Sequence, residues 1–171
     1  PKGALVLAVT SQAEASGAIV PLYPLPELGT LGELGHVHFA IDRDGLVRSI
    51  FLNEAGLPAF ALASLSGPSR RELPALALSA LNSVGRSARD AALASGSWPT
   101  SHRALLPRLS HLPPRIPAAA LLRSEVPASL LRDKVVLLGV TAAGLGDRHP
   151  SVLVSGAGDA LVPGLHLHAS A

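Results

Sequence analysis

Short apolar runs, separated by stretches rich in proline and glycine, dominate the hydrophobic pattern of this chain. Residues 3–9, GALVLAV, form such a run and predict a buried strand. Residues 134–141, KVVLLGVT, are β-branched as well as apolar and predict the clearest buried strand of the sequence. Residues 21–34 are rich in proline and glycine and predict a loop.

A β-hairpin is predicted over residues 35–52, GHVHFAIDRDGLVRSIFL. Between residues 37 and 41, apolar side chains alternate with His38 and Ala40, and a second short apolar run spans residues 46–52. The sequence Asp-Arg-Asp-Gly lies between these two runs and is a turn signal. The pattern therefore predicts two antiparallel strands joined by that turn.

Helices are predicted in the second half of the chain. Residues 74–95 have the best helical composition, and Pro74 suits a first helical position. Residues 116–125 and 126–133 each predict a short helix with a proline near its start. Between these helices, residues 96–120 are mostly loop-like, with a short strand predicted within ALLPRL.

The order of these elements indicates the fold class. Strands and helices alternate, which predicts an α/β fold with a mixed sheet and flanking helices. The length of 171 residues is enough for one domain with its own core, so residues 1–171 are assigned to a single domain. The tail VPGLHLHASA predicts either a strand or the beginning of a helix.

Composition excludes several classes of function. The chain is 48% hydrophobic with a mean hydropathy of +0.39, so extensive burial or a partner surface is expected. Its net charge is +2 and its arginines are scattered, which argues against a nucleic-acid partner. It contains no cysteine, and this excludes disulfides, thiol catalysis and cysteine-based zinc sites. None of its apolar runs is long enough to span a bilayer.

A glycine-rich loop follows the predicted strand of residues 134–141. Gly139, Gly144 and Gly146 give the pattern G-x-x-x-x-G-x-G, which is close to a phosphate-binding P-loop. The lysine and the hydroxyl residue of a P-loop are missing, and the carboxylate of Asp147 would repel a phosphate. The loop is therefore interpreted as a structural or small-ligand loop.

Two H-x-H pairs, residues 36–38 and 166–168, raise the question of a metal site. On a strand both side chains of such a pair share a face and could chelate zinc, whereas on a helix they point to nearly opposite sides. The plain interpretation is a set of histidines on polar faces. A histidine–carboxylate site that adds Asp147 or His149 remains the alternative.

The remaining polar groups give no catalytic signature. Asp42 and Asp44 precede Gly45, and no further calcium ligand follows at EF-hand spacing. They are therefore interpreted as a turn in which aspartate side chains bond the backbone. The sequence has no G-x-S-x-G pattern, so an enzymatic activity of this chain is not predicted.

Three stretches together resemble a known family. Residues 35–52 are similar to the Gly-His-Val-Asn-Phe, Asp-x-Asp-Gly-Val-x-Arg pattern of the type-two CHASE domain, a cyclase/histidine-kinase-associated sensory extracellular domain. The stretch LLRDKVVLLGVTAAGLGDRHPSVLVSG resembles its Gly-Lys-Ile-Val-Leu-Val-Gly-x-Thr-Ala-x-Gly-Leu-x-Asp segment, and VPGLHLHASA its Pro-Gly-Val-x-Ile-His-Ala-Asn. Their order and spacing also fit. His38 and Ser170 stand where the family usually has asparagine.

The resemblance implies a sensor rather than an enzyme. Such domains lie outside the cytoplasmic membrane of bacteria, tethered by transmembrane helices, so a periplasmic part of an inner-membrane protein is expected. The output module would be a histidine kinase, a diguanylate cyclase, an adenylate cyclase or a Ser/Thr kinase. The signal would be an unknown small molecule or protein, with no cofactor, and the parent chain would form a homodimer.

The family pattern also includes about two earlier strand–helix units that this sequence lacks. The chain is therefore expected to be a fragment, an incomplete three-layer domain with an open sheet edge that invites pairing.

A ligand site is predicted at the C-terminal edge of the strand of residues 134–141, where α/β sheets bind ligands. The candidate ligand-binding residues are Thr141, Gly144, Asp147, Arg148, His149 and His36. The competing interpretation is that Asp147 only holds the turn.

Two other functions of the chain stay open. One is a metal-dependent hydrolase that uses His36, His38 and Asp147, although no metal is the first expectation. The other is a purely structural dimerisation module.

Overall fold

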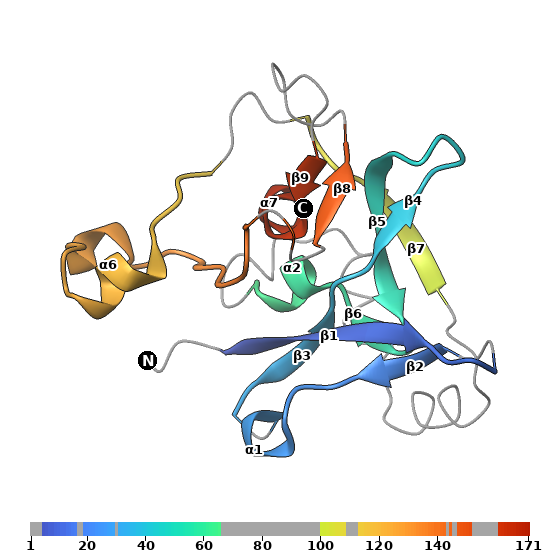
Figure 1. Ribbon diagram of the computed structural model, residues 1–171, viewed down its shortest axis with the longest axis horizontal. Helices are drawn as coiled ribbons and strands as arrows, with labels where there is room; N and C mark the ends of the chain where they lie inside the picture. Colours follow the sequence, from blue (N-terminus) through green and yellow to red (C-terminus); the bar gives the residue numbers. More distant parts are fainter. Residues whose placement is uncertain are drawn as a thin grey trace.

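The structure of the chain is a computed structural model, shown in Figure 1. It describes residues 5–16, 19–29, 31–65, 100–108, 113–142, 144, 147–151 and 161–171. The helix predicted over residues 74–95 lies outside these residues. The described elements confirm the predicted α/β class, with several open sheets and few helices. Among the described residues, no helix has the length and apolar character needed to cross a lipid bilayer.

The first sheet has the order β2-β1-β3. Strand β1 (Val6–Ala13) pairs antiparallel with β2 (Ile19–Leu22) and parallel with β3 (Glu33–His36). The helix α1 (Pro26–Gly29) lies between β2 and β3 along the chain. The predicted strand at the N-terminus is confirmed, but within β1 only Val9 is buried, so its predicted burial is wrong.

The predicted loop of residues 21–34 was wrong in part, because it contains the end of β2, α1 and the start of β3. The prolines of this stretch indicated a loop, but one of them, Pro21, lies inside a strand. Pro21 belongs to β2, which is an edge strand of the sheet, where proline is tolerated.

The second sheet is built around β5 (Val47–Glu54) and confirms the predicted hairpin of residues 35–52 in part. Residues 35 and 36 belong to β3 of the first sheet, and residues 37 and 38 belong to no strand. Strand β4 (Phe39–Ile41) pairs antiparallel with β5, and β6 (Leu57–Pro58) pairs with the end of β5. Strand β7 (Thr100–Leu105) occupies the other edge and begins earlier than the short strand predicted within ALLPRL. A parallel bridge between His36 and Ala59 joins this sheet to the first one.

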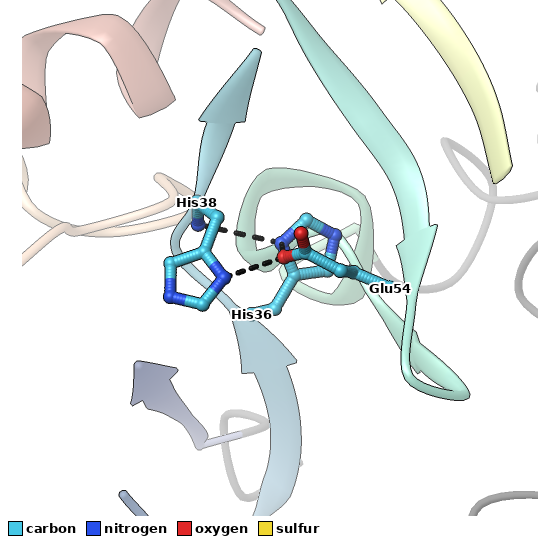
Figure 2. Close-up of side chains that lie close together, drawn as sticks. All are labelled: His36, His38 and Glu54. Atoms are coloured by element: carbon cyan, nitrogen blue, oxygen red, sulfur yellow. Dashed lines mark hydrogen bonds and ion pairs between the residues drawn. The ribbon is translucent and has the colours of Figure 1, made fainter. Parts of the chain in front are cut away.

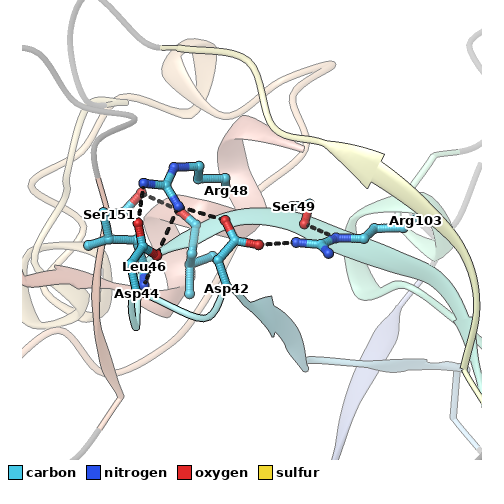
Figure 3. A network of polar contacts seen from close by, with 8 residues as sticks. Asp42, Asp44, Leu46, Arg48, Ser49, Arg103 and Ser151 are labelled. Carbon is cyan, nitrogen blue, oxygen red and sulfur yellow. Dashed lines mark hydrogen bonds and ion pairs between the residues drawn. The ribbon is translucent and has the colours of Figure 1, made fainter.

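The turn between β4 and β5 uses its aspartates as predicted (Figure 3). The carboxylate of Asp44 accepts a hydrogen bond from the backbone N–H of Leu46 at 3.1 Å, and Gly45 adopts a φ of 80°. The Arg48 guanidinium donates to Asp42 at 2.7 Å and to both oxygens of Asp44. These contacts lower the pKa of both carboxyls, that of Asp44 to about 2. The Asp-x-Asp-Gly stretch is therefore an ion-paired turn.

The main apolar core lies between β5 and the C-terminal elements. Strands β8 (Arg148–Pro150) and β9 (Leu161–Pro163) pair antiparallel, and α2 (Phe60–Ala63) and α7 (Gly164–Ser170) pack nearby (Figure 1). The tail thus forms a strand followed by a helix. The buried cluster consists of Val47, Ile50, Leu52, Ala59, Leu62, Leu106, Val162 and Leu167.

The two short helices predicted after residue 115 are confirmed. They are the α-helix α6 (Ala118–Leu122) and the 3-10 helix η1 (Ala128–Leu130). Each follows a proline, Pro117 or Pro127, which occupies the N-cap position. Helix α6 lies at the left of Figure 1, away from the sheets.

The strand predicted over residues 134–141 is wrong. These residues form neither helix nor strand, and Val135, Val136, Leu138 and Val140 are all more than half exposed. An apolar run of this kind becomes a buried strand only when neighbouring strands satisfy its backbone and other elements cover both faces. No described strand pairs with this segment. Its Gly139 does approach the side chain of Leu165 in α7.

Candidate functional site

Two histidines and one glutamate converge where the two sheets meet, and Figure 2 shows both rings close to the carboxylate. His36 is the last residue of β3, His38 lies in the link to β4, and Glu54 is the last residue of β5. The Nδ1 atom of His38 lies 2.5 Å from Oε2 of Glu54, and Nδ1 of His36 lies 3.3 Å from the same oxygen. We call these three residues the histidine–glutamate cluster.

The backbone around the cluster explains why these side chains meet. At Gly35, a Cβ atom would lie 2.7 Å from the Cα atom of Phe60, so glycine lets α2 approach β3 beside His36. After Glu54, the two-residue loop Ala55-Gly56 has positive φ at both positions, as a tight hairpin turn requires. The strained Ala55, with a φ of 49°, is held by burial.

Burial dominates the electrostatics of His36. Its side chain is fully buried, and the cost of desolvating a charged ring lowers its pKa to about 4. Glu54 opposes this shift, whereas the nearby His38 and His168 add to it. At neutral pH the His36 imidazole is therefore uncharged and can act as a hydrogen-bond acceptor or a metal ligand.

His38 faces two hydroxyl groups on the side away from Glu54. Its Nε2 atom lies 3.0 Å from Oγ of Ser11 and 3.3 Å from Oγ1 of Thr10, both in β1. Its backbone N–H donates to Nδ1 of His36 at 3.4 Å. Because the Glu54 carboxylate only accepts hydrogen bonds, Nδ1 of His38 donates to it, and in the neutral ring Nε2 accepts from a hydroxyl group.

A second chain of contacts joins the glycine-rich loop to the hairpin. The Nε2 atom of His149 lies 3.2 Å from a carboxylate oxygen of Asp147. The His149 ring packs edge-on against Phe39 with centroids 4.9 Å apart, and Phe39 stacks on His168 at 4.5 Å. The ring of His168 in turn donates from Nε2 to the backbone carbonyl of Val37 at 3.2 Å. Val37 lies between the two histidines of the cluster.

Helix α7 is anchored by these contacts at both ends. Its first residue, Gly164, donates its backbone N–H to the carbonyl of Asp147 at 3.1 Å. A Cβ atom at Gly164 would lie 2.3 Å from Oδ1 of Asp147, so a larger residue there would force this carboxylate to move. Near the other end of the helix, burial lowers the pKa of His168 to about 4.

The structure gathers only part of the predicted ligand site. Asp147 and His149 are in contact, and the chain of rings brings them near His168. Gly144 is exposed with a φ of 91°, and the Arg148 guanidinium donates to the backbone carbonyl of Leu161 at 2.6 Å. Thr141 is half-buried, and His36 belongs to the histidine–glutamate cluster. The edge of a strand over residues 134–141 does not exist, so it cannot form the site.

The second H-x-H pair is not a chelating pair. His166 and His168 lie in α7, where residues two apart point in different directions. Burial lowers the pKa of both rings.

Glu54 is the residue that sequence reasoning missed. The first H-x-H pair was combined with Asp147 or His149, but within the described residues the close group of three is His36, His38 and Glu54. One signal was present in the sequence. Glu54 is an acidic residue that closely follows the apolar run of residues 46–52 and directly precedes the turn at Ala55 and Gly56.

Comparison with known proteins places the chain in a family. No curated protein and no solved structure matches it at a significant level. The family model of the CHASE2 domain matches residues 4–171, nearly the whole chain. This agrees with the Gly-His-Val pattern of the hairpin and the Gly-Leu-x-Asp pattern before β8. The chain therefore belongs to the CHASE2 family, the extracellular sensory domains of signalling proteins.

Proposed function

We propose that this chain is the periplasmic input domain of a bacterial signalling protein anchored in the inner membrane. Its cytoplasmic output would be a histidine kinase, a diguanylate cyclase, an adenylate cyclase or a Ser/Thr kinase. The observation that carries the proposal is the match of the CHASE2 model to residues 4–171. The domain itself performs no chemistry and acts through its conformation.

The proposed signal path ends at helix α7. The carboxylate of Asp147 is exposed and lies against the first residue of this helix, and it also contacts His149. A ligand that binds Asp147 would act directly on the packing of Gly164, and through Phe39 on His168. Such a ligand transmits a signal only if it binds two arrangements of the domain with different affinity.

The charge at this position indicates the chemistry of the ligand. Asp147 is anionic, and within the described residues its nearest ionisable partner is His149. An anionic site of this kind favours a cationic or hydroxyl-bearing molecule and disfavours phosphate esters.

A thermal-shift screen with cationic and hydroxylated small molecules tests the ligand site. A true ligand raises the melting temperature of the wild type and leaves that of Asp147→Asn unchanged. Asp133→Asn is the matched control, because Asp133 is also exposed and its φ of 57° suits asparagine. A ligand that stabilises all three proteins equally binds elsewhere and overturns this site.

The sequence that flanks these residues in the parent gene tests the wider proposal. Membrane-spanning helices next to the domain, followed by a kinase or cyclase, are the expected result. A parent protein without any membrane-spanning segment contradicts it.

A further inference from the structure

The histidine–glutamate cluster has the composition of a transition-metal site. Two imidazole nitrogens and one carboxylate oxygen, from His36, His38 and Glu54, all lie within 4.8 Å of one another. Figure 2 shows that the atoms facing each other are the ones that bind metals. Two histidines and one glutamate form a known ligand set for Zn²⁺ with an open fourth position.

Two of the three distances between the ligand atoms can be compared directly with what a metal requires, and all three are within 4.8 Å. Two ligands of a tetrahedral Zn²⁺ ion at bond lengths of about 2.0–2.1 Å lie about 3.3 Å apart. The distance from Nδ1 of His36 to Oε2 of Glu54 is 3.3 Å, which already has this value. Nδ1 of His38 lies 2.5 Å from the same oxygen, so the His38 ring must move away from Glu54 by about 0.8 Å to reach the spacing of 3.3 Å. His38 is 21% exposed, which gives it room to move.

The supporting structure of the cluster is rigid on one side and adaptable on the other. The bridge between His36 and Ala59 and the tight turn after Glu54 fix two ligands at the ends of paired strands. The third, His38, is held by the Ser11 hydroxyl at 3.0 Å from Nε2. When Nδ1 binds a metal, Nε2 carries the proton and can donate it to this hydroxyl, which is the outer-shell contact that metal-bound histidines use.

The buried carboxylate gives a second reason. Glu54 is 5% exposed, and its Oε2 lies 2.5 Å from Nδ1 of His38, which partners it in this structure. A divalent cation between the three ligand atoms would take the place of the proton between these two groups and offset the desolvation of the carboxylate.

We propose that His36, His38 and Glu54 bind a divalent transition-metal ion, with Zn²⁺ as the representative probe. The two imidazole ligands favour such ions over Mg²⁺ and Ca²⁺, which prefer oxygen ligands. This departs from the expectation from sequence that the chain binds no metal, and the reason is Glu54. The inference does not depend on the sensory function, because it rests only on the three side chains and their surroundings.

Equilibrium dialysis with Zn²⁺ near pH 7, followed by elemental analysis, tests the proposal on the 171-residue chain. One equivalent of Zn²⁺ per chain is expected, and Mg²⁺ or Ca²⁺ in excess should not displace it. Co²⁺ bound at the same site should give the visible absorption bands of a four-coordinate ion. A chain that retains no Zn²⁺ overturns the proposal.

Single substitutions locate the site. His38→Gln should weaken Zn²⁺ binding by more than about 100-fold, beyond the effect of outer-shell changes, and Ser11→Ala by about 10-fold. His102→Gln is the matched control, because this exposed histidine on β7 is not one of the three ligand residues. Equal affinity of His38→Gln and wild type contradicts the site. Circular dichroism checks that each variant is folded, and Glu54→Gln gives a second test if His38→Gln is not.

Discussion

Strand β5 and the segment of residues 134–141 both contain a short apolar run, yet only the first forms a strand with buried side chains. In β5 most side chains are buried, and the strand pairs with β4, β6 and β7. In the later segment four large apolar side chains are more than half exposed, and no described strand pairs with it. An apolar pattern therefore identifies a candidate strand, but partners at its edges decide whether the strand forms.

A matched pair of leucine substitutions tests this contrast most strongly. Leu52 in β5 is 8% exposed, and Leu138 is 81% exposed. Leu52→Ala should lower the free energy of unfolding by about 2–5 kcal/mol, because it leaves a cavity in the core. Leu138→Ala should change it by less than about 0.5 kcal/mol. Urea denaturation followed by circular dichroism measures both.

The same two substitutions can also contradict the contrast between β5 and residues 134–141. If Leu138→Ala destabilises the protein as much as Leu52→Ala does, the later segment is buried in solution. If that effect disappears on dilution, a second copy of the chain covers it.

A pair of glycine substitutions gives the next largest effect. A Cβ atom at Gly35 would lie 2.7 Å from backbone of Phe60, whereas one at Gly139 would lie 3.1 Å from the end of the Leu165 side chain. Gly35→Ala should therefore cost about 1–3 kcal/mol, because the backbone of α2 must shift. Gly139→Ala should be close to neutral, since a leucine side chain can turn away. Thermal denaturation of both variants measures the difference, and equal costs would contradict the rigid packing at Gly35.

Acid should weaken the packed region by a smaller amount. In the folded chain the pKa of His168 is about 4, and in the unfolded chain it returns to its ordinary value of 6.5. Between these values the unfolded chain binds more protons, so stability is complete above pH 6.5 and falls as the pH drops toward 4. At pH 5.5 the loss from His168 should be about 1 kcal/mol relative to pH 7.

The measurement is the difference between wild type and His168→Gln in denaturant titrations at these two pH values. Glutamine cannot take up the proton but can still donate to the Val37 carbonyl. His36 has a similarly lowered pKa, so the variant keeps part of the pH dependence. Identical pH profiles of the two proteins would contradict the role given to His168.

Local chemistry explains which parts of the fold could be predicted. The hairpin of β4 and β5 was found because its alternation and its Asp-Arg-Asp-Gly turn are local signals. The short helices α6 and η1 were found because a proline precedes each. The strand over residues 134–141 was a wrong prediction, because its formation depends on partners that no local pattern specifies.

The candidate site was harder to predict for the same reason. The proximity of His36 and His38 is visible in the sequence, but the third member is 16 residues beyond His38, since it is Glu54. Its position follows from the register of β5 and from the turn at Ala55, which only the folded chain fixes. Asp147 was recognised as a candidate, and both its ligand-binding role and its role as a holder of the turn stay predictions; its backbone carbonyl accepts a hydrogen bond from Gly164.

The contact of Asp147 with Gly164 has a consequence for how this family is recognised. The two residues belong to separate stretches of the family pattern, Gly-Leu-x-Asp and Pro-Gly, and 16 residues lie between them. In space they touch so closely that a single methyl group at position 164 would collide with the carboxylate. A larger residue at position 164 would therefore displace the Asp147 carboxylate, so the two signatures meet in one contact of the folded chain.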